Sequence, residues 1–175
     1  TGFMKVKRNL EPYEIYDQVV LLNRAALAHH KQPLTNIVFT GMGEPLLNYN
    51  NVLAGIEKIT SENGLHISSK RITVSTAGLA KMIKKLADDD VKFNLALSLH
   101  AADDIKRSKL MPINEANNLS DLVKALNYFY DKTGNRITFE YILFDGINES
   151  MEDAKNLVAL CSKVPARVNI IEYNT

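Results

Sequence analysis

The sequence has one cysteine, no tryptophan and only five prolines in 175 residues. A single cysteine excludes an internal disulfide and fits a reducing compartment. Purely apolar runs extend over only a few residues, as in 19–22, so no segment is long enough to span a bilayer. The chain opens Thr-Gly-Phe-Met-Lys and carries no apolar signal segment. We therefore expect a cytoplasmic protein with no membrane partner and no disulfide partner.

Charge of one sign is not in excess either. Lys and Arg total 21 and Asp and Glu total 20, which gives a formal net charge of +1 at pH 7. No bulk field draws such a chain onto nucleic acid, so a nucleic-acid partner has to be met by a local patch. Basic clusters are most often solvated surface, but three here are candidates for contact with an RNA backbone: residues 5–8, 70–71 and 106–109.

The composition and the hydrophobic pattern predict one α/β domain over residues 1–175. Apolar residues make up 46% and charged residues 23%, and no linker or internal repeat divides the chain. Short β-branched segments alternate with amphipathic ones, which favours a parallel sheet with helices between its strands. The predicted strands are residues 35–40, 71–75, 91–99, 136–144 and 167–171. The predicted helices lie near residues 10–31, 52–59, 79–87, 119–133 and 151–162.

The first helix has a start signal and a single apolar face. Asn9 is the predicted N-cap, and Pro12 suits the first turn. Helical spacing places four apolar residues on one face: Ile15, Val19, Leu22 and Ala26.

The order of elements is unusual at both ends, because it begins with a helix and ends on a strand. A parallel unit normally begins with a strand. We therefore expect an excerpt that lacks at least one N-terminal strand and its loop, with strand 35–40 beside an exposed sheet edge. Five such strands fit a doubly wound sheet or a curved partial barrel, and periodicity does not separate the two.

Every predicted strand ends in polar residues. Ligands of parallel α/β folds bind at the carboxyl ends of the strands. Polar loops are common by default, but five polar exits in register favour a binding site. The exits are residues 41–45, 75–78, 98–100, 145–148 and 172–174.

The loop Gly41-Met-Gly-Glu-Pro45 is the most specific of these exits. It is neither a dinucleotide-binding fingerprint nor a P-loop. Gly41 and Gly43 allow a ligand to approach the backbone. Glu44 repels a phosphate but suits a cation, and Pro45 favours an extended Glu44 whose carbonyls are free to accept. The loop therefore suits an ammonium group, with a tight turn carrying a solvated Glu as the alternative.

The remaining chemistry-bearing residues are weaker candidates. Cys161 shares a helical face with apolar residues and is expected to be a small buried hydrophobe. His29, His30 and His66 lack partners at metal-ligand spacing. His100, at a strand exit, is the histidine that we expect in a site. We predict no metal ligand in this chain.

Ordered motifs along the whole chain resemble one family. The motifs are Arg8–Leu10, Gly41–Asn48, Arg71–Thr76, Leu97–Ala101, Met111–Asn114, Thr138–Tyr141 and Val168–Ile171. They are closely similar to the radical S-adenosylmethionine (SAM) adenine-C2 methyltransferases, which modify large-subunit ribosomal RNA and some tRNAs.

The resemblance implies a fold and a set of cofactors. The family fold is a partial (β/α)6 TIM-like barrel, of which this chain would hold the first helix to the sixth strand, without the first strand and the cluster loop. The family binds a [4Fe–4S] cluster through a C-x-x-x-C-x-x-C loop just upstream of a Thr-Gly that resembles Thr1-Gly2. The cluster ligands and both catalytic cysteines would then lie outside this chain, and no catalytic residue maps onto it.

What remains resembles the SAM cradle of the family. By this resemblance Gly43 and Glu44 hold the methionine amino group. Ser75 and the triplet Ser98, Leu99 and His100 line the ligand, and Asn174 contacts its adenine end.

The resemblance predicts a radical SAM methyltransferase of 23S ribosomal RNA, and of tRNA, that acts on C2 of adenine. The excerpt alone is expected to be inactive. The related C8-methylating enzymes share these motifs and are the alternative within the class. A cluster-free module that binds nucleotide or RNA is an alternative of another class. An enzyme acting on phosphate esters is a third, and Glu44 argues against it.

Overall fold

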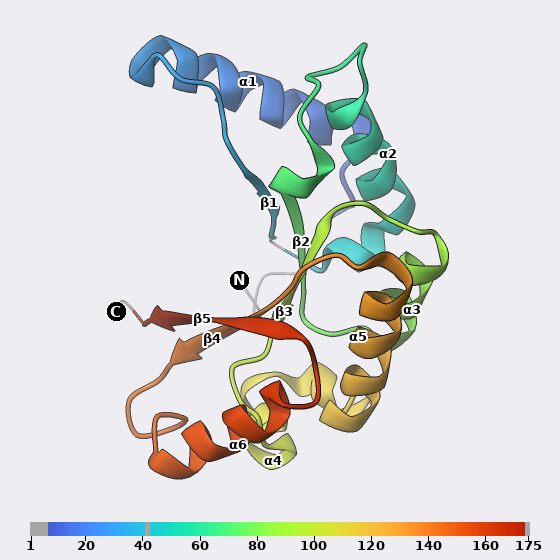
Figure 1. Cartoon of the computed structure of the whole chain (residues 1–175). Helices are drawn as coiled ribbons and strands as arrows, with labels where there is room; N and C mark the ends of the chain where they lie inside the picture. Colours follow the sequence, from blue (N-terminus) through green and yellow to red (C-terminus); the bar gives the residue numbers. More distant parts are fainter. Residues whose placement is uncertain (1–6, 41–42, 174–175) are drawn as a thin grey trace. The chain divides into compact units, whose positions relative to one another are not determined.

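The computed structural model describes residues 7–40 and 43–173 (Figure 1). The chain forms two compact units, Thr1–Val74 and Ser75–Thr175. The helices are α1 (Pro12–His30), α2 (Tyr49–Thr60), α3 (Ala80–Asp88), α4 (Asp104–Leu110), α5 (Leu119–Thr133) and α6 (Met151–Cys161), with 3-10 turns η1 (Pro45–Asn48), η2 (Ser69–Arg71) and η3 (Pro112–Glu115). The strands are β1 (Ile37–Phe39), β2 (Ile72–Thr76), β3 (Asn94–Ser98), β4 (Ile137–Leu143) and β5 (Ala166–Glu172). The predicted alternation of strands and helices is confirmed.

The N-cap of helix α1 lies two residues later than predicted. Asn9 was the wrong choice, because the N-cap is Glu11. The backbone N–H of Glu11 donates to the carboxylate of Glu14 (2.9 Å), and Arg8 donates to both oxygens of that carboxylate (2.6 Å each). A carboxylate in the first turn satisfies amides that have no partner within the helix. Glu11 therefore takes the N-cap position that the sequence suggested for Asn9, and Glu14 completes the capping box.

Only the first half of α1 is packed within the first unit. Ile15 and Val19 are buried, whereas Leu22 is 61% exposed. The contact with α2 is close at Gly55, where an added Cβ would lie 2.8 Å from Cγ2 of Ile15. The helix confirms the shared face of the four residues, of which Ile15 and Val19 are buried within this chain.

The strands pair in parallel within each part of the sheet. In the first unit β1 pairs with β2, with Val38 opposite Thr73. In the second unit β3 pairs with β4 and β4 with β5, with Ser98 opposite Glu140 and Tyr141 opposite Ile170. Parallel pairing brings the carboxyl ends of β3, β4 and β5 to the same edge. Among the described residues, β1 pairs only with β2 and lies at one end of the strand order. This agrees with the prediction that strand 35–40 lies beside an exposed sheet edge.

Helix α4 was not predicted, because the expected elements left residues 100–118 without a helix or strand. Its start is fixed by Asp103, whose side chain accepts a hydrogen bond from the N–H of Lys106 (2.8 Å). Pro112 follows the helix and begins η3. These are ordinary start and stop signals, and the charge of the segment concealed them.

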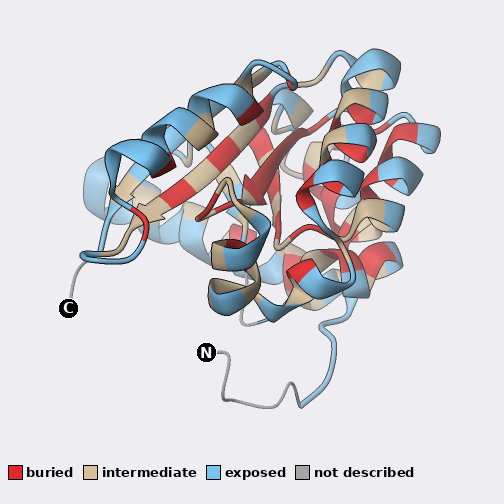
Figure 2. Cartoon of the chain, turned by 90° about the horizontal axis from the view of Figure 1, so that it is seen from below, coloured by how far each residue is buried: buried red, intermediate tan, exposed pale blue. Residues whose placement is uncertain are grey.

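The core of the second unit lies on its strands and on the inner sides of its helices (Figure 2). Leu95, Leu97, Phe139 and Phe129 are at most 1% exposed, which is the expected pattern for parallel strands covered by helices. Within the described residues, no helix combines the length and apolarity needed to cross a membrane.

Candidate ligand site at the strand exits

The loop that follows β1 places Gly43 and Glu44 side by side in the first unit. Gly43 is exposed and Glu44 is half-buried. Glu44 is extended (φ −108°, ψ 113°), as Pro45 predicts, and one carboxylate oxygen accepts from the N–H of Leu46 (3.0 Å). The carbonyl of Glu44 accepts from the N–H of Leu47 (3.0 Å). The expectation of a free carbonyl at Glu44 was therefore wrong, because this carbonyl closes the turn of η1.

The capping role does not conflict with an ammonium partner. A carboxylate has about four acceptor positions in total, and the cap to Leu46 uses one of them. Leu46 is 2% exposed and anchors η1 in the core of the first unit. The two features together hold Glu44 in place next to a glycine. Gly41, which was expected to help the ligand approach the backbone, lies outside the described residues.

The exit of β3 carries three of the predicted site residues in the second unit. Ser98 is the last residue of the strand, Leu99 is fully buried and His100 is half-buried. The N–H groups of Leu99 and His100 both donate to the carbonyl of Glu140 (2.9 and 3.3 Å). The chain then turns sharply, with Ala101 N–H donating back to Leu99 O (2.7 Å). This turn ends β3 after Ser98, so that the chain leaves the sheet at Leu99 and His100.

The backbone at His100 is in a conformation that side chains seldom adopt. Its φ is +55°, which costs a non-glycine residue on the order of 1–3 kcal/mol. Such conformations persist where the surroundings over-determine them, and they gather at ligand sites. The strained turn therefore supports the prediction that this strand exit is functional.

The imidazole of His100 is held as a neutral hydrogen-bond donor. Its Nδ1 accepts from the backbone N–H of Ile142 (3.1 Å), so the ring proton sits on Nε2. Burial, and then the positive charge of Arg107, lower the pKa of His100 to about 4. A neutral ring with Nε2–H can donate to a ligand acceptor but does not serve as a cation at neutral pH.

Ser75 lies in β2 and is half-buried. The residues after it form a tight turn in which Gly78 N–H donates to the hydroxyl of Thr76 (3.0 Å). Asn174 lies outside the described residues. The site assignments for Ser75 and Asn174 stay predictions.

Arg107 and Asn148 are polar residues of this region that the site prediction did not include. Arg107 was grouped with an exposed basic cluster, but it is 0% exposed and faces the strand exits. It is therefore removed from the candidate RNA surface. Asn148 is 1% exposed and lies in the exit loop of β4. Its place in the sequence Asp145-Gly-Ile-Asn148, directly after a strand, was the signal available for it.

Cys161 and the acidic residues do not form a further centre. Cys161 ends α6 at intermediate exposure, so it is less buried than expected, and burial raises the pKa of its thiol. In the part of the chain that the structure describes, no group of three His, Cys, Asp or Glu side chains is placed to hold a metal ion. The described residues therefore do not fit the ligand set of an iron–sulfur cluster.

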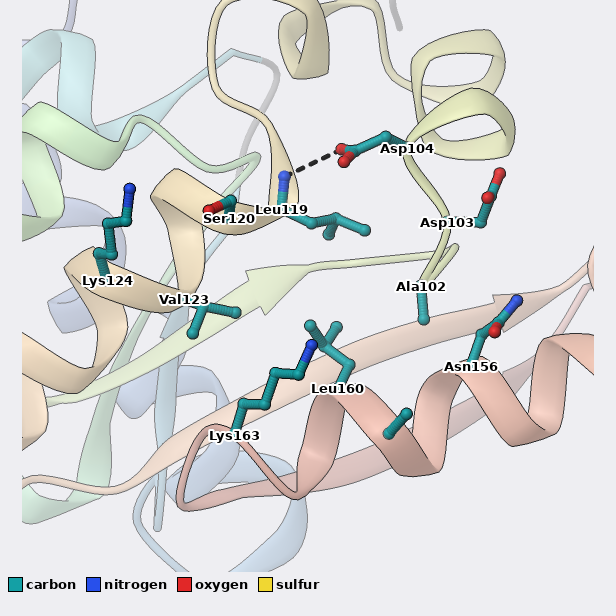
Figure 3. Close-up of a pocket in the computed structure, with 11 residues that line it drawn as sticks. Ala102, Asp103, Asp104, Leu119, Ser120, Val123, Lys124, Asn156, Leu160 and Lys163 are labelled. Carbon is teal, nitrogen blue, oxygen red and sulfur yellow. Dashed lines mark hydrogen bonds between the residues drawn. The ribbon is translucent and has the colours of Figure 1, made fainter.

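A separate cavity of about 530 Å³ lies between the start of α4, α5 and α6 (Figure 3). None of the predicted site residues lines it. Its acidic residues have structural partners, because Asp103 caps α4 and Asp104 accepts from the N–H of Leu119 (2.9 Å). This cavity is therefore not the candidate site.

The low pKa of His100 predicts a pH-dependent stability. The unfolded residue titrates near 6.5 and the folded one near 4, so between these values the unfolded chain binds more protons. The contribution of His100 to the folding stability is then fully present above about pH 6.5, and it is lost as the pH drops toward 4. Between pH 7 and pH 5 we expect a loss of about 1–2 kcal/mol from this group.

Urea denaturation of the full-length protein at pH 7 and pH 5 measures this loss. His100→Asn is the comparison, because Asn tolerates positive φ and offers an acceptor to Ile142. The variant should lose less stability between the two pH values than the wild type does. An identical pH dependence in both proteins would contradict the assignment.

The sequence profile described as "Radical SAM superfamily" matches residues 3–158. A probable dual-specificity RNA methyltransferase RlmN of Cytophaga hutchinsonii is 65% identical over 99% of this chain, which covers 48% of that protein. The dual-specificity RNA methyltransferase RlmN of Anaeromyxobacter dehalogenans is 43% identical, again over 99% of this chain and 48% of its own length. The chain therefore spans about half the length of the curated relatives it matches.

Solved structures agree with these sequence relationships. A radical SAM methyltransferase from Sphaerobacter thermophilus superposes with a TM-score of 0.91 at 40% identity, over 97% of this chain and 49% of that one. Streptococcus suis SuiB bound to S-adenosylmethionine superposes with a TM-score of 0.63 at 20% identity, over 99% of this chain and 36% of that one, which shows the fold alone. The α/β fold with five parallel strands is thus shared with a radical SAM methyltransferase. The chain belongs to the radical SAM superfamily.

Proposed function

We propose that this chain is the SAM-binding part of an RNA methyltransferase that methylates C2 of adenine in 23S ribosomal RNA and in tRNA. The observation that carries the proposal is the 65% identity to a probable dual-specificity RNA methyltransferase over 99% of the chain. The exit of β3 supports it, because its strained backbone and polar residues lie at the edge where parallel α/β folds bind ligands. The fold of the complete catalytic domain is a partial (β/α)6 barrel in this proposal.

Each predicted site residue has a role suited to one part of SAM. The Glu44 carboxylate and the backbone at Gly43 receive the ammonium group, since a carboxylate is a charge-complementary acceptor. Ser75, Ser98 and Leu99 line the ligand, and the Nε2–H of His100 donates to one of its acceptors. Asn174 meets the adenine end.

The chemistry of methyl transfer needs groups beyond these residues. In the radical SAM superfamily a reduced [4Fe–4S] cluster supplies the electron that cleaves SAM. The contribution of this chain is to bind SAM, to hold it in one orientation and to present its polar groups to fixed partners.

The test is a methylation assay with the full-length protein, 23S ribosomal RNA and SAM. Digestion of the product and mass spectrometry of the nucleosides locate the new methyl group. Methylation at C2 of adenine supports the proposal. Methylation at C8, or binding of RNA without any transfer in a protein reconstituted with its cluster, would contradict it.

A second prediction concerns the 175-residue chain taken alone. Thiolates hold iron–sulfur clusters, and the chain has one cysteine. After reconstitution with iron and sulfide, we expect no stable cluster absorption in the visible spectrum and no methyl transfer to RNA. The full-length protein treated in the same way is the control, and a stable cluster on the short chain would contradict the prediction.

A further inference from the structure

The three consecutive carbonyls of Ser98, Leu99 and His100 are each held by a buried side chain. We infer that Arg107 and Asn148 are positioning residues for SAM, which act by fixing the backbone of this triplet. The inference rests on the proposed function, because it takes the triplet as part of the SAM site. It adds two residues that do not touch the ligand but determine where its contacts lie.

Arg107 holds the first two carbonyls. Its Nη2 donates to Ser98 O (3.1 Å) and its Nε donates to Leu99 O (3.2 Å). The same Nη2 donates to Ala77 O (2.7 Å), one residue beyond the end of β2. A guanidinium presents its donors in a rigid planar fork. One side chain therefore fixes the spacing between the exits of β2 and β3.

The orientation of the guanidinium is itself fixed. Nη1 donates to Oδ1 of Asn114 (2.7 Å), which is 2% exposed. The amide nitrogen of Asn114 donates in turn to Oδ1 of Asp104 (2.9 Å). Burial lowers the pKa of Arg107 to about 10, and the charge of Asp104 opposes this shift. The group stays protonated at neutral pH and donates to four oxygens and to the sulfur of Met111.

Asn148 holds the third carbonyl. Its Nδ2 donates to His100 O (2.6 Å) and to Ile142 O (2.7 Å), and its Oδ1 accepts from Phe144 N–H (2.7 Å). The carbonyl of Asn148 accepts from the hydroxyl of Tyr141 (2.8 Å). Asn148 therefore ties the exit of β3 to the exit of β4. It holds the last carbonyl of the triplet, whereas Arg107 holds the first two.

The two residues explain how the strained turn persists. His100 lies beyond the end of β3, and its carbonyl is held by the amide of Asn148, while Arg107 donates to the carbonyls of Ser98 and Leu99. His100 has φ +55° and also contributes its imidazole Nδ1 to Ile142. With its backbone fixed at both ends and its ring fixed by one nitrogen, Nε2–H points in one direction. A ligand that meets a preformed donor loses less affinity to ordering than one that meets a mobile donor.

The same contacts could serve the fold alone, so the test separates ligand affinity from stability. The variants are Arg107→Lys, which keeps the charge but loses the fork, and Asn148→Asp, which keeps the acceptor for Phe144 but loses the amide donors. The control is Asp153→Asn. It weakens the ion pair (2.6 Å) between Asp153 and Lys106, the neighbour of Arg107 in α4. Asp153 is also buried, at 4% exposure, and it contacts none of the triplet carbonyls.

All variants are made in the full-length protein, and SAM and S-adenosylhomocysteine are titrated by calorimetry. We expect the Kd for both ligands to rise about tenfold or more in Arg107→Lys and in Asn148→Asp, which corresponds to about 1.4 kcal/mol. The control should change its Kd by less than about twofold at a comparable loss of stability in urea, since a contact outside the triplet leaves the ligand-facing groups in place. Amide hydrogen exchange at residues 99–101 should accelerate in the two variants and not in the control.

Unchanged ligand affinity in both variants, with only their stability lowered, would overturn the inference, as would failure of both variants to fold. A wild-type protein that binds neither ligand would overturn the proposed function instead, and the inference with it. Binding of RNA by the variants should match the wild type, because neither side chain is on the surface.

Discussion

Replacing Glu44 by Gln is expected to weaken SAM binding about tenfold or more. The substitution keeps the size of the side chain and an acceptor for the N–H of Leu46, so the turn η1 is retained. It removes the negative charge that would receive the ammonium group. A charge-assisted hydrogen bond contributes about 1.5–3 kcal/mol, and about 1.4 kcal/mol corresponds to a factor of ten in affinity.

Replacing Gly43 by Val should weaken binding further. A branched side chain there would occupy the space through which the ligand approaches the backbone. Calorimetric titration of the cluster-containing full-length protein with SAM measures both effects. Cys161→Ala is the control and should bind as the wild type does, because Cys161 lies at the end of α6 and is not one of the predicted site residues. Equal affinity in wild type, Glu44→Gln and Gly43→Val would show that this loop does not bind the ammonium group.

The sequence predicted the strands well because each one is short, apolar and followed by polar residues. Residues 136–144 were predicted as a strand, and β4 spans Ile137–Leu143. The helix ends were less predictable, because several polar residues compete for one cap. Asn9 and Glu11 both precede α1, and the ion pair between Arg8 and Glu14 favours the later start.

The positioning residues could not be predicted, because their role depends on contacts between distant parts of the sequence. Arg107 lies next to Lys106 and near Lys109, and nothing local distinguishes a buried guanidinium from an exposed one. Its partners Ala77 and Ser98 are 30 and 9 residues away in sequence. The predicted site residues came from a motif, whereas the groups that hold Ser98, Leu99 and His100 are visible only in three dimensions.

The turn at Gly78 is where this supporting structure tolerates substitution least. Gly78 has φ +108°, a conformation that costs any other residue on the order of 1–3 kcal/mol. An added Cβ would lie 3.1 Å from Leu122 Cδ2, 3.1 Å from Leu97 Cδ1 and 3.2 Å from Arg107 Nη2. The two leucines are 1% exposed, and Nη2 of Arg107 is bound to Ala77 O and Ser98 O. None of these neighbours can move without loss, so overpacking adds about 1–3 kcal/mol to the conformational cost.

We therefore expect Gly78→Ala to destabilise the full-length protein by about 2–6 kcal/mol in urea denaturation, the sum of the conformational and overpacking costs. Gly134→Ala is the matched control, because Gly134 also has positive φ (+63°) but has nothing within 4 Å of an added Cβ. It should lose only the conformational part, about 1–2 kcal/mol. If the carbonyls of Ser98 and Leu99 border the SAM site as proposed, SAM affinity should fall in Gly78→Ala and not in Gly134→Ala, since only the former crowds Arg107. Equal losses of stability in the two variants would mean that the neighbours of Gly78 yield to the new methyl group, and that Arg107 is held less firmly than its four oxygen partners indicate.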